Sequence, residues 1–363
     1  MSKPVGITIN GRFLSRPAPG VNRFARELLR AWLPAHARKD NIAFSAPRSS
    51  PCPEGNEFAI PWRSAGAFNG HAWEQLQLPR VCGDDVLLSL CNTGPVGRHR
   101  QLAVLHDASA MAFPAAYSRS FRTWYKWLLG GLMKRARVIA TVSRFSADEL
   151  RRHTGVSRAV IEVISESGEH VLEAPAQRSI LERLALTNRP YVLAVGSRTP
   201  NKNLLGVIEA ASLLGDLGVT IVAAGGSQER VFAGVDLSGR DVVLAGYVSD
   251  GELRALYEGA HCFIFPSFYE GFGLPPLEAM HCGCPVVVSR RASLPEVCAD
   301  AAVYCEPDSP ADIAKQLRRV LTSESLRSEL RQAGLARAST FSWAQAAAQL
   351  EEILKTNFAW GGT

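Results

Sequence analysis

Short apolar runs alternate with longer stretches of helical periodicity along most of the chain. In the first half, runs rich in β-branched residues predict strands at 5–9, 42–45, 85–89, 101–105 and 138–142. Helical patterns lie between them, notably at 21–35 and 120–135. The second half predicts strands at 191–195, 220–224, 242–244, 262–265, 285–288 and 302–304, each followed by a helical segment. Strands that alternate with helices are typical of parallel α/β sheets.

The pattern breaks once, near the middle of the chain. Residues 166–178 lose the periodicity and are rich in Glu, Ser, Ala and Pro, so we interpret them as a linker. A chain of 363 residues is long for one hydrophobic core and suits two. We therefore expect one domain at 1–172 and a second at 173–345, with a C-terminal helix at 346–363 that packs back on the first domain.

Charge is distributed unequally between the halves. Residues 1–180 hold 24 Lys and Arg against 14 Asp and Glu, whereas residues 181–363 hold 16 against 20. The basic first half is expected to meet something anionic, such as a membrane surface, a phosphorylated acceptor or nucleic acid. No stretch approaches the length of a membrane-spanning helix, and the first residues lack the apolar run of a signal peptide, so we expect a cytoplasmic protein.

The eight cysteines do not have the spacing of a zinc site. Cys282 and Cys284 are close in sequence, and we interpret them as small packing residues, with reduced thiols. Asp84 and Asp85 precede a predicted strand, which favours a polar turn over a metal site. We therefore predict no metal ligands.

The loop at 270–278 carries the strongest chemical signal. It reads Glu-Gly-Phe-Gly-Leu-Pro-Pro-Leu-Glu and follows the strand predicted at 262–265. Its glycines let the backbone approach a ligand, and Pro275 and Pro276 can open a helix whose free amides suit a diphosphate. Glu270 and Glu278 can then accept hydrogen bonds from sugar hydroxyls. The alternative is a surface turn with two solvated glutamates.

Two further loops follow predicted strands of the second half. In the loop 196–203, Arg198 and Lys202 can neutralise a leaving diphosphate at a helix start, although each taken singly is equally consistent with a solvated cation. In the loop 245–249, backbone groups of Gly246 and Tyr247 are candidates for reading a base edge. Ligands of open α/β sheets bind at the carboxyl ends of the strands, where these loops lie.

The segment 270–278 matches an E-x7-E motif, and with Arg198, Lys202 and Asn203 the chain resembles the family 4 retaining glycosyltransferases. Further landmarks are Gly20, the pair His106-Asp107 and the segment 141–150. The resemblance implies an α/β GT-B fold, with two Rossmann-like, doubly wound domains facing across a cleft, the first binding the acceptor and the second the nucleotide sugar. One departure is Ser165-Glu-Ser-Gly-Glu-His170, where relatives often carry a Pro-Asn-Gly-Val turn, and it puts the geometry of domain closure in question.

The resemblance also implies residue roles. Arg198 and Lys202 would hold the diphosphate, Glu270 the donor sugar and Glu278 the ribose. His106 would lie near the donor C6 region and the acceptor, and His106 and Asp107 are candidates for assisting the transfer, although such a pair is as often structural. The expected catalytic set is Glu270, Arg198, Lys202, His106 and Asp107. The expected donor-binding set is Gly20, Gly196, Asn203, Gly246, Tyr247, Val248, Gly271, Phe272, Gly273, Leu274 and Glu278.

The implied reaction moves a hexose or deoxyhexose, with retention, from a nucleotide sugar to a glycan or polyprenyl-linked acceptor in surface polysaccharide synthesis. The Gly-Phe-Gly-Leu-Pro-Pro variant resembles mannosyl- and rhamnosyltransferases, so GDP-mannose is the first expectation. Family members generally need no divalent cation or other cofactor. Alternatives are an epimerase or phosphorylase of the same fold, or a non-catalytic nucleotide-sugar-binding protein. Nucleic-acid binding is disfavoured because no recognisable module is present.

Residues 121–137 interleave aromatic and basic side chains. We interpret this stretch first as an amphipathic helix packed on the front sheet. The alternative is a helix that contacts the inner face of the cytoplasmic membrane.

Overall fold

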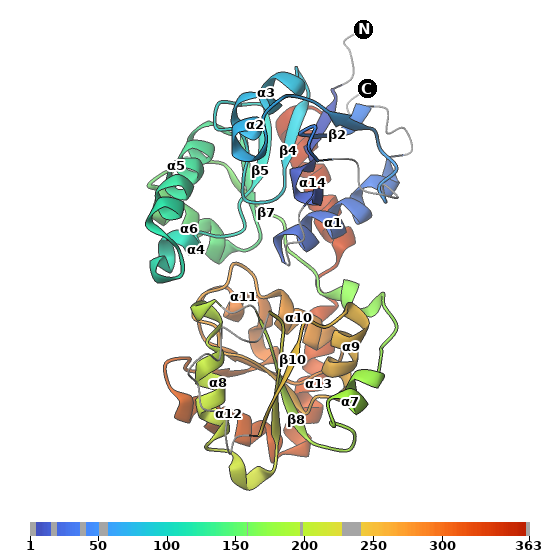
Figure 1. The fold of residues 1–363 in the computed structure, drawn as a ribbon, viewed down its shortest axis with the longest axis vertical. Helices are drawn as coiled ribbons and strands as arrows, with labels where there is room; N and C mark the ends of the chain where they lie inside the picture. Colours follow the sequence, from blue (N-terminus) through green and yellow to red (C-terminus); the bar gives the residue numbers. More distant parts are fainter. Residues whose placement is uncertain are drawn as a thin grey trace. The chain divides into compact units, whose positions relative to one another are not determined.

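A computed structural model describes residues 5–15, 20–36, 41–50, 57–157, 159–196, 199–226 and 241–360. The chain divides into two compact units, a front unit of Met1–Glu166 with Trp343–Thr363 and a back unit of Ser167–Ser342. Each unit is built on one parallel sheet with helices on its faces (Figure 1). The sequence pattern had set the two boundaries at 172/173 and 345/346.

In the described part of the front unit, seven parallel strands have the order β3-β2-β1-β4-β5-β6-β7. The strands are β1 Ile7–Asn10, β2 Ile42–Ala46, β3 Trp62–Ser64, β4 Val86–Ser89, β5 Gln101–Val104, β6 Val138–Thr141 and β7 Ile161–Val163. The helices are α1 Val21–Trp32, α2 Gly70–Leu76, α3 Leu78–Val81, α4 Ser109–Ala112, α5 Arg119–Arg135, α6 Arg144–Thr154 and α14 Trp343–Phe358. The five inner strands were predicted, and the two edge strands β3 and β7 were missed.

The last helix, α14, packs in the front unit although it follows the whole back unit in sequence. It lies beside α1, red beside blue in Figure 1. The indole Nε1 of Trp32 donates to Glu351 Oε2 at 2.8 Å, and the ring of Trp360 lies 5.4 Å from that of Trp32. The backbone amide of Ser165 donates to Gln349 Oε1 at 3.2 Å. These contacts tie both ends of the front unit's sequence into one core.

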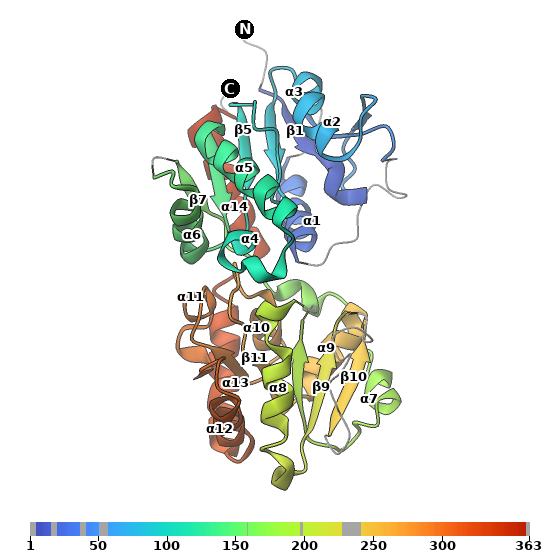
Figure 2. The same cartoon turned by 60° about the vertical axis from the view of Figure 1, so that its left-hand side comes forward.

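In the described part of the back unit, six parallel strands have the order β10-β9-β8-β11-β12-β13 (Figure 2). The strands are β8 Tyr191–Val195, β9 Thr220–Ala224, β10 Val242–Gly246, β11 Cys262–Phe265, β12 Val286–Ser289 and β13 Val303–Cys305. The helices are α7 Ser179–Arg183, α8 Leu204–Ala211, α9 Asp250–Gly259, α10 Leu274–His281, α11 Leu294–Cys298, α12 Pro310–Leu321 and α13 Glu324–Ala338. All six strands were predicted, so the two-sheet α/β fold class is confirmed.

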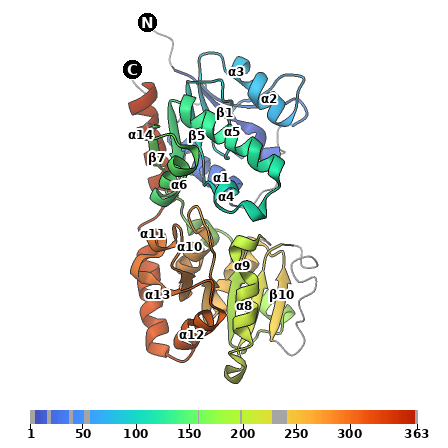
Figure 3. The same cartoon turned by 90° about the vertical axis from the view of Figure 1, so that its left-hand side faces the viewer.

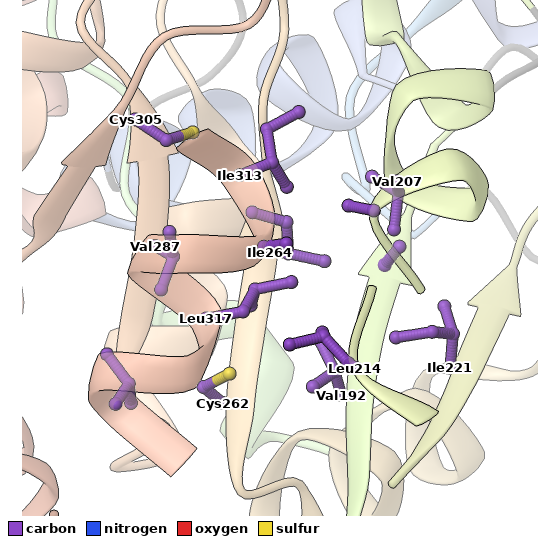
Figure 4. Packing of buried hydrophobic residues seen from close by; sticks show 14 of the residues in the cluster. Val192, Val207, Leu214, Ile221, Cys262, Ile264, Val287, Cys305, Ile313 and Leu317 are labelled. Carbon is purple, nitrogen blue, oxygen red and sulfur yellow. The ribbon is translucent and has the colours of Figure 1, made fainter. Parts of the chain in front are cut away.

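One face of the back sheet forms an apolar core against α8 and α12. Figure 4 shows Val192, Cys262 and Ile264 of the strands facing Val207 of α8 and, from α12, Ile313 and Leu317. Burial raises the pKa of the Cys262 thiol to about 12, so this cysteine is an apolar packing group. The core fixes the strands whose carboxyl ends carry the candidate site.

The pairs singled out as non-ligands in the sequence lie in ordinary structural settings. Cys284 is buried, and desolvation raises the pKa of its thiol well above the usual value, as expected for a packing residue. Asp85 accepts a hydrogen bond from Thr8 Oγ1 at 2.8 Å just before β4. The expected polar turn at 84–85 is therefore present.

Helix α5 lies on the front sheet through one face, as the first interpretation of 121–137 proposed (Figure 3). Tyr125, Leu128 and Leu132 are buried against residues of β5 and β6. Phe121, which stacks on Tyr125 at the start of the same face, is 43% exposed, and Trp127 on the outward side is 52% exposed. Of the helices that the structure describes, none has the length and apolarity needed to cross a bilayer.

The segment interpreted as a linker is more ordered than its composition indicates. Residues from Ser167 onward belong to the back unit, and Glu169–Leu172 form a turn of 3₁₀ helix with His170 buried. Ser167 Oγ donates to the carbonyl of Phe341 at 3.2 Å. The segment therefore contributes side chains to the back unit.

Candidate active site

The three loops predicted to carry the chemistry all follow strands of the back sheet. The loops start after β8, β10 and β11, and β8 pairs with β11 in parallel register. Parallel neighbours end at the same edge, so the loops after β8 and β11 are adjacent. This edge is where open α/β sheets bind ligands.

Lys202 and Glu270 form an ion pair between the loops that follow β8 and β11. Lys202 Nζ lies 2.6 Å from Glu270 Oε1 and 2.7 Å from Oε2. Only 20% of the lysine side chain and 10% of the glutamate side chain are exposed. The pair thus sits at the edge of bulk water, where the two charges interact more strongly than at an open surface.

Backbone and side-chain contacts hold the two loops against each other. Asn201 Nδ2 donates to the carbonyl of Tyr269 at 3.1 Å, and the amide of Phe268 donates to the carbonyl of Asn201 at 2.7 Å. The ammonium of Lys202 also lies 4.9 Å from the centre of the Phe265 ring. These contacts fix the position of the Lys202 side chain.

Gly196 lies beside the stem of Lys202. A Cβ atom built at Gly196 would meet the Cβ and Cγ atoms of Lys202 at 3.5 Å. The amide of Gly196 donates to the carbonyl of Ala224 at 3.1 Å, which anchors the start of this loop to the end of β9. The predicted Gly196, Lys202 and Glu270 are therefore brought together by the structure.

Ser293 holds the glycine-rich loop through two hydrogen bonds to its backbone. Its buried Oγ donates to the carbonyl of Glu270 at 3.0 Å and to that of Phe272 at 2.6 Å. Gly273 follows with φ of 114°, a conformation that favours glycine, and caps α10. Ser293 was not identified from the sequence, because its two hydrogen-bond partners lie 21 and 23 residues away along the chain.

The start of α10 presents backbone amides at the same loop. Leu274 is the first helical residue, and proline stands in the first turn. Proline lacks an N–H and fits the first helical position, while the remaining free amides and the positive end of the helix dipole favour an anion. The predicted helix start at 274–276 is confirmed.

Glu278 lies one turn into α10 with both carboxylate oxygens engaged. His170 Nε2 is 2.9 Å from Oε1, and the hydroxyl of Tyr257 donates to Oε2 at 3.0 Å. Burial, and then the adjacent Glu278 carboxylate, raise the pKa of the Tyr257 hydroxyl well above its usual value, so this group remains a donor. Neither His170 nor Tyr257 was identified from the sequence.

The close approach of Gly168 to α10 explains how His170 reaches Glu278. A Cβ atom built at Gly168 would lie 2.7 Å from the amide nitrogen of Glu278 and 2.8 Å from the carbonyl carbon of Leu277. The backbone at Gly168 therefore packs directly on α10. This close approach places the following 3₁₀ turn, with His170, beside the Glu278 carboxylate.

Other predicted donor-binding residues have different local partners. Asn203 adopts a left-handed conformation at the start of α8, and its Nδ2 donates to the carbonyl of Pro307 at 2.7 Å. Gly246 ends β10 with φ of 70°, Tyr247 is 89% exposed and Val248 is partly buried. Arg198 lies outside the described residues. Of the described residues, Asn203, Gly246, Tyr247 and Val248 therefore make no side-chain hydrogen bond or ion pair to Lys202 or Glu270.

In the front unit, His106 is buried at the carboxyl end of β5. Its Nε2 lies 3.1 Å from the carbonyl of Leu90, and its Nδ1 lies 3.4 Å from Glu166 Oε1. The ring meets Phe24 edge to face at 4.7 Å. Glu166, which was assigned to the linker from sequence, is thus a partner of His106.

Asp107 and Gly20 have identifiable backbone roles. Asp107 Oδ1 accepts from the amide of Ser109, the first residue of the short α4, at 2.8 Å. Gly20 is exposed, precedes α1 and has φ of 74°. A side chain at that φ would be strained, so the glycine is required by the backbone.

Replacing Tyr257 by Phe removes one donor from a buried carboxylate without changing the shape of the ring. We expect Tyr257→Phe to lower the free energy of unfolding by about 2 kcal/mol, because hydrogen bonds to charged groups contribute roughly 1.5–3 kcal/mol. Tyr304→Phe is the matched control, since its hydroxyl donates to the Ala299 carbonyl at an exposed site. Tyr257 lies in the back unit, whereas all seven tryptophans lie in the front unit, so tryptophan fluorescence would not report on the affected unit. Urea unfolding is therefore followed by circular dichroism. Equal losses for the two variants would contradict the role of Tyr257.

Residues 177–337 match the family model described as glycosyl transferases group 1. Over 255 residues the chain is 33% identical to O-antigen chain mannosyltransferase B of Escherichia coli, covering 67% of each protein. It is 32% identical over 265 residues to the serotype-specific mannosyltransferase WbdA of Escherichia coli, covering 68% of this chain and 32% of that longer relative. The chain thus spans about a third of WbdA.

Among solved structures, sucrose-phosphate synthase of Thermosynechococcus elongatus superposes with a TM-score of 0.75, covering 98% of this chain and all of that one. At 19% identity this likeness concerns the fold alone. Sequence and fold agree, and the chain belongs to the group 1 glycosyltransferases with a GT-B fold.

Proposed function

We propose that this glycosyltransferase moves a hexose or deoxyhexose, with retention, from a nucleotide sugar to a glycan or polyprenyl-linked acceptor in surface polysaccharide synthesis. The observation that carries the proposal is the Lys202–Glu270 pair beside the start of α10. It offers a cation and free amides to a diphosphate, and a carboxylate to sugar hydroxyls. The similarity to O-antigen mannosyltransferase B favours mannose, and GDP-mannose as the donor.

The proposed donor contacts follow from the groups in the back unit. Lys202 and the backbone amide of Leu274 hold the diphosphate, together with Arg198, which lies outside the described residues. Glu270 accepts from hydroxyls of the sugar. Glu278 accepts from the ribose through lone pairs that His170 and Tyr257 do not use, since a carboxylate offers about four acceptor positions.

In the proposed reaction, the bond between sugar C1 and the diphosphate oxygen breaks as a bond from C1 to the acceptor oxygen forms on the same face. The acceptor proton passes to an oxygen of the departing diphosphate. Negative charge grows on that group, and the ammonium of Lys202 stabilises it. Because this chain supplies the positive charge itself, we propose that no divalent cation is required.

A thermal-shift panel of GDP-, UDP-, dTDP- and ADP-sugars tests the donor. We expect GDP-mannose to stabilise the protein, by about 2.7 kcal/mol at a concentration 100 times its Kd. EDTA should leave the shift unchanged. Stabilisation by a UDP- or ADP-sugar alone would reject GDP-mannose, and a shift that requires added magnesium would reject metal independence.

Lys202→Met and Glu270→Gln should each lower kcat/KM by at least about 100-fold, because each removes a group that meets the developing charge or the sugar. Lys315→Met, at an exposed position of α12, is the matched control and should retain activity. Removing one partner leaves the other unpaired, so each single variant should also lose some stability. The double variant should recover part of that stability while remaining inactive, and an active double variant would reject both assigned roles.

We also propose that the basic front unit associates peripherally with the inner face of the cytoplasmic membrane. The outward side of α5 carries the exposed residues Lys126 and Trp127. An aromatic side chain beside a cation suits the boundary between anionic head groups and acyl chains.

Vesicle flotation tests this membrane contact. Lys126→Glu/Trp127→Ala should reduce flotation with vesicles that contain phosphatidylglycerol, compared with the unmodified chain. Arg178→Glu/Leu213→Ala is the control, because it makes the same charge change and removes an apolar side chain that is also 52% exposed. Unchanged flotation of the α5 variant would end the proposal.

A further inference from the structure

Two adjoining cavities open at the amino edge of the front sheet. Their volumes are about 630 Å³ and about 450 Å³, and both are lined by His99, Arg137 and Asn357. His99 precedes β5, and Arg137 directly precedes β6. The cavities therefore lie at the opposite edge of the sheet from His106, which follows the carboxyl end of β5.

Basic side chains from three separate segments line the cavities. No carboxylate is present among the described residues that form their walls. All six of these side chains belong to exposed residues, namely His99, Arg100, Lys134, Arg135, Arg137 and Lys355.

Most of these Lys and Arg side chains have no carboxylate partner among the described residues. Lys355 pairs with Glu351 at 3.3 Å, whereas no carboxylate of the described residues pairs with Arg100, Lys134 or Arg135. The C-terminal ends of α5 and α14 each contribute about half a negative charge. Together with Glu351 they offset about two of the five Lys and Arg charges, so a net charge of about +3 remains.

Arg137 is held in a fixed orientation in the wall that the two cavities share. Its Nε donates to the carbonyl of Asn357, and its guanidinium lies 6.0 Å from the centre of the Phe358 ring. Its two terminal nitrogens have no partner among the described residues. A guanidinium fixed in this way presents a planar pair of donors, which matches two oxygens of a phosphate.

We propose that these cavities bind a phosphate-bearing anion at a site separate from the donor site. Like charges gathered in a concave surface repel one another and concentrate counter-ions, so an anion both relieves the repulsion and gains hydrogen bonds. The preorganised guanidinium and the neighbouring lysine and arginines favour phosphate over a carboxylate. The phosphate comes from a lipid head group or from a soluble phosphate compound. The inference does not rest on the proposed donor or acceptor.

Calorimetry with inorganic pyrophosphate tests the site in an Arg198→Ala/Lys202→Ala background, where the proposed donor site has lost both of its cations. Lys134→Glu/Arg135→Glu should weaken binding at least tenfold. The control Arg151→Glu/Arg152→Glu, on α6 of the same unit, makes an identical charge change and should stay within about twofold of the parent. Both pairs belong to the last turns of their helices, so the comparison separates the cavity from net charge.

A parallel titration with dihexanoyl phosphatidylglycerol, below its micelle concentration, distinguishes a lipid head group from a soluble phosphate compound as the ligand. Tighter binding of this lipid than of pyrophosphate, lost in Lys134→Glu/Arg135→Glu, identifies a lipid head group. Binding of pyrophosphate alone, with the same loss, identifies a soluble phosphate. Equal weakening in the cavity variant and the control, or no binding of either probe, would overturn the proposal.

Discussion

The contact between Lys202 and Glu270 depends on the pairing of β8 with β11. These strands are parallel neighbours, so the loops after them emerge side by side although 68 residues separate the two charged groups. Removing either charge from water is costly, and the bidentate contact together with the Asn201 hydrogen bonds offsets that cost. The edge of the sheet is therefore polar, and contacts within the back unit hold the two loops against each other.

The carboxylate of Glu278, in the same unit, is held by other side chains than a lysine. Glu278 is buried, and the side chains of His170 and Tyr257 each contact one of its carboxylate oxygens. Glu270 has Lys202 as its partner, whereas no Lys or Arg of the described residues forms an ion pair with Glu278. Such a group remains a strong acceptor for hydroxyls. The different environments of Glu270 and Glu278 thus agree with different ligands for the two ends of one motif.

The inner strands were predictable because both of their faces are buried and their sequences are continuous apolar runs. The edge strand β3 was missed because Trp62–Ser64 is short and largely exposed, and α13 because few of its residues are buried. In the site, Lys202 and Glu270 were found because each lies next to a predicted strand end. His170 and Ser293 were missed because their partners lie far away in sequence, and only packing brings them together. Composition suggested a linker at 166–178, since close backbone approach at Gly168 leaves no hydrophobic signature.

The charge asymmetry of the chain indicated an anionic partner but could not locate it. The structure places basic side chains, most of them without a carboxylate partner among the described residues, at the amino edge of the front sheet, where β5 and β6 begin. The carboxyl edge of the same sheet carries His106, whose ring faces a carbonyl and a carboxylate. A parallel sheet makes this separation possible, because all its strands begin at one edge and end at the other. Charges that attract a distant anion can then accumulate at one edge without altering the hydrogen bonds of the polar groups at the other.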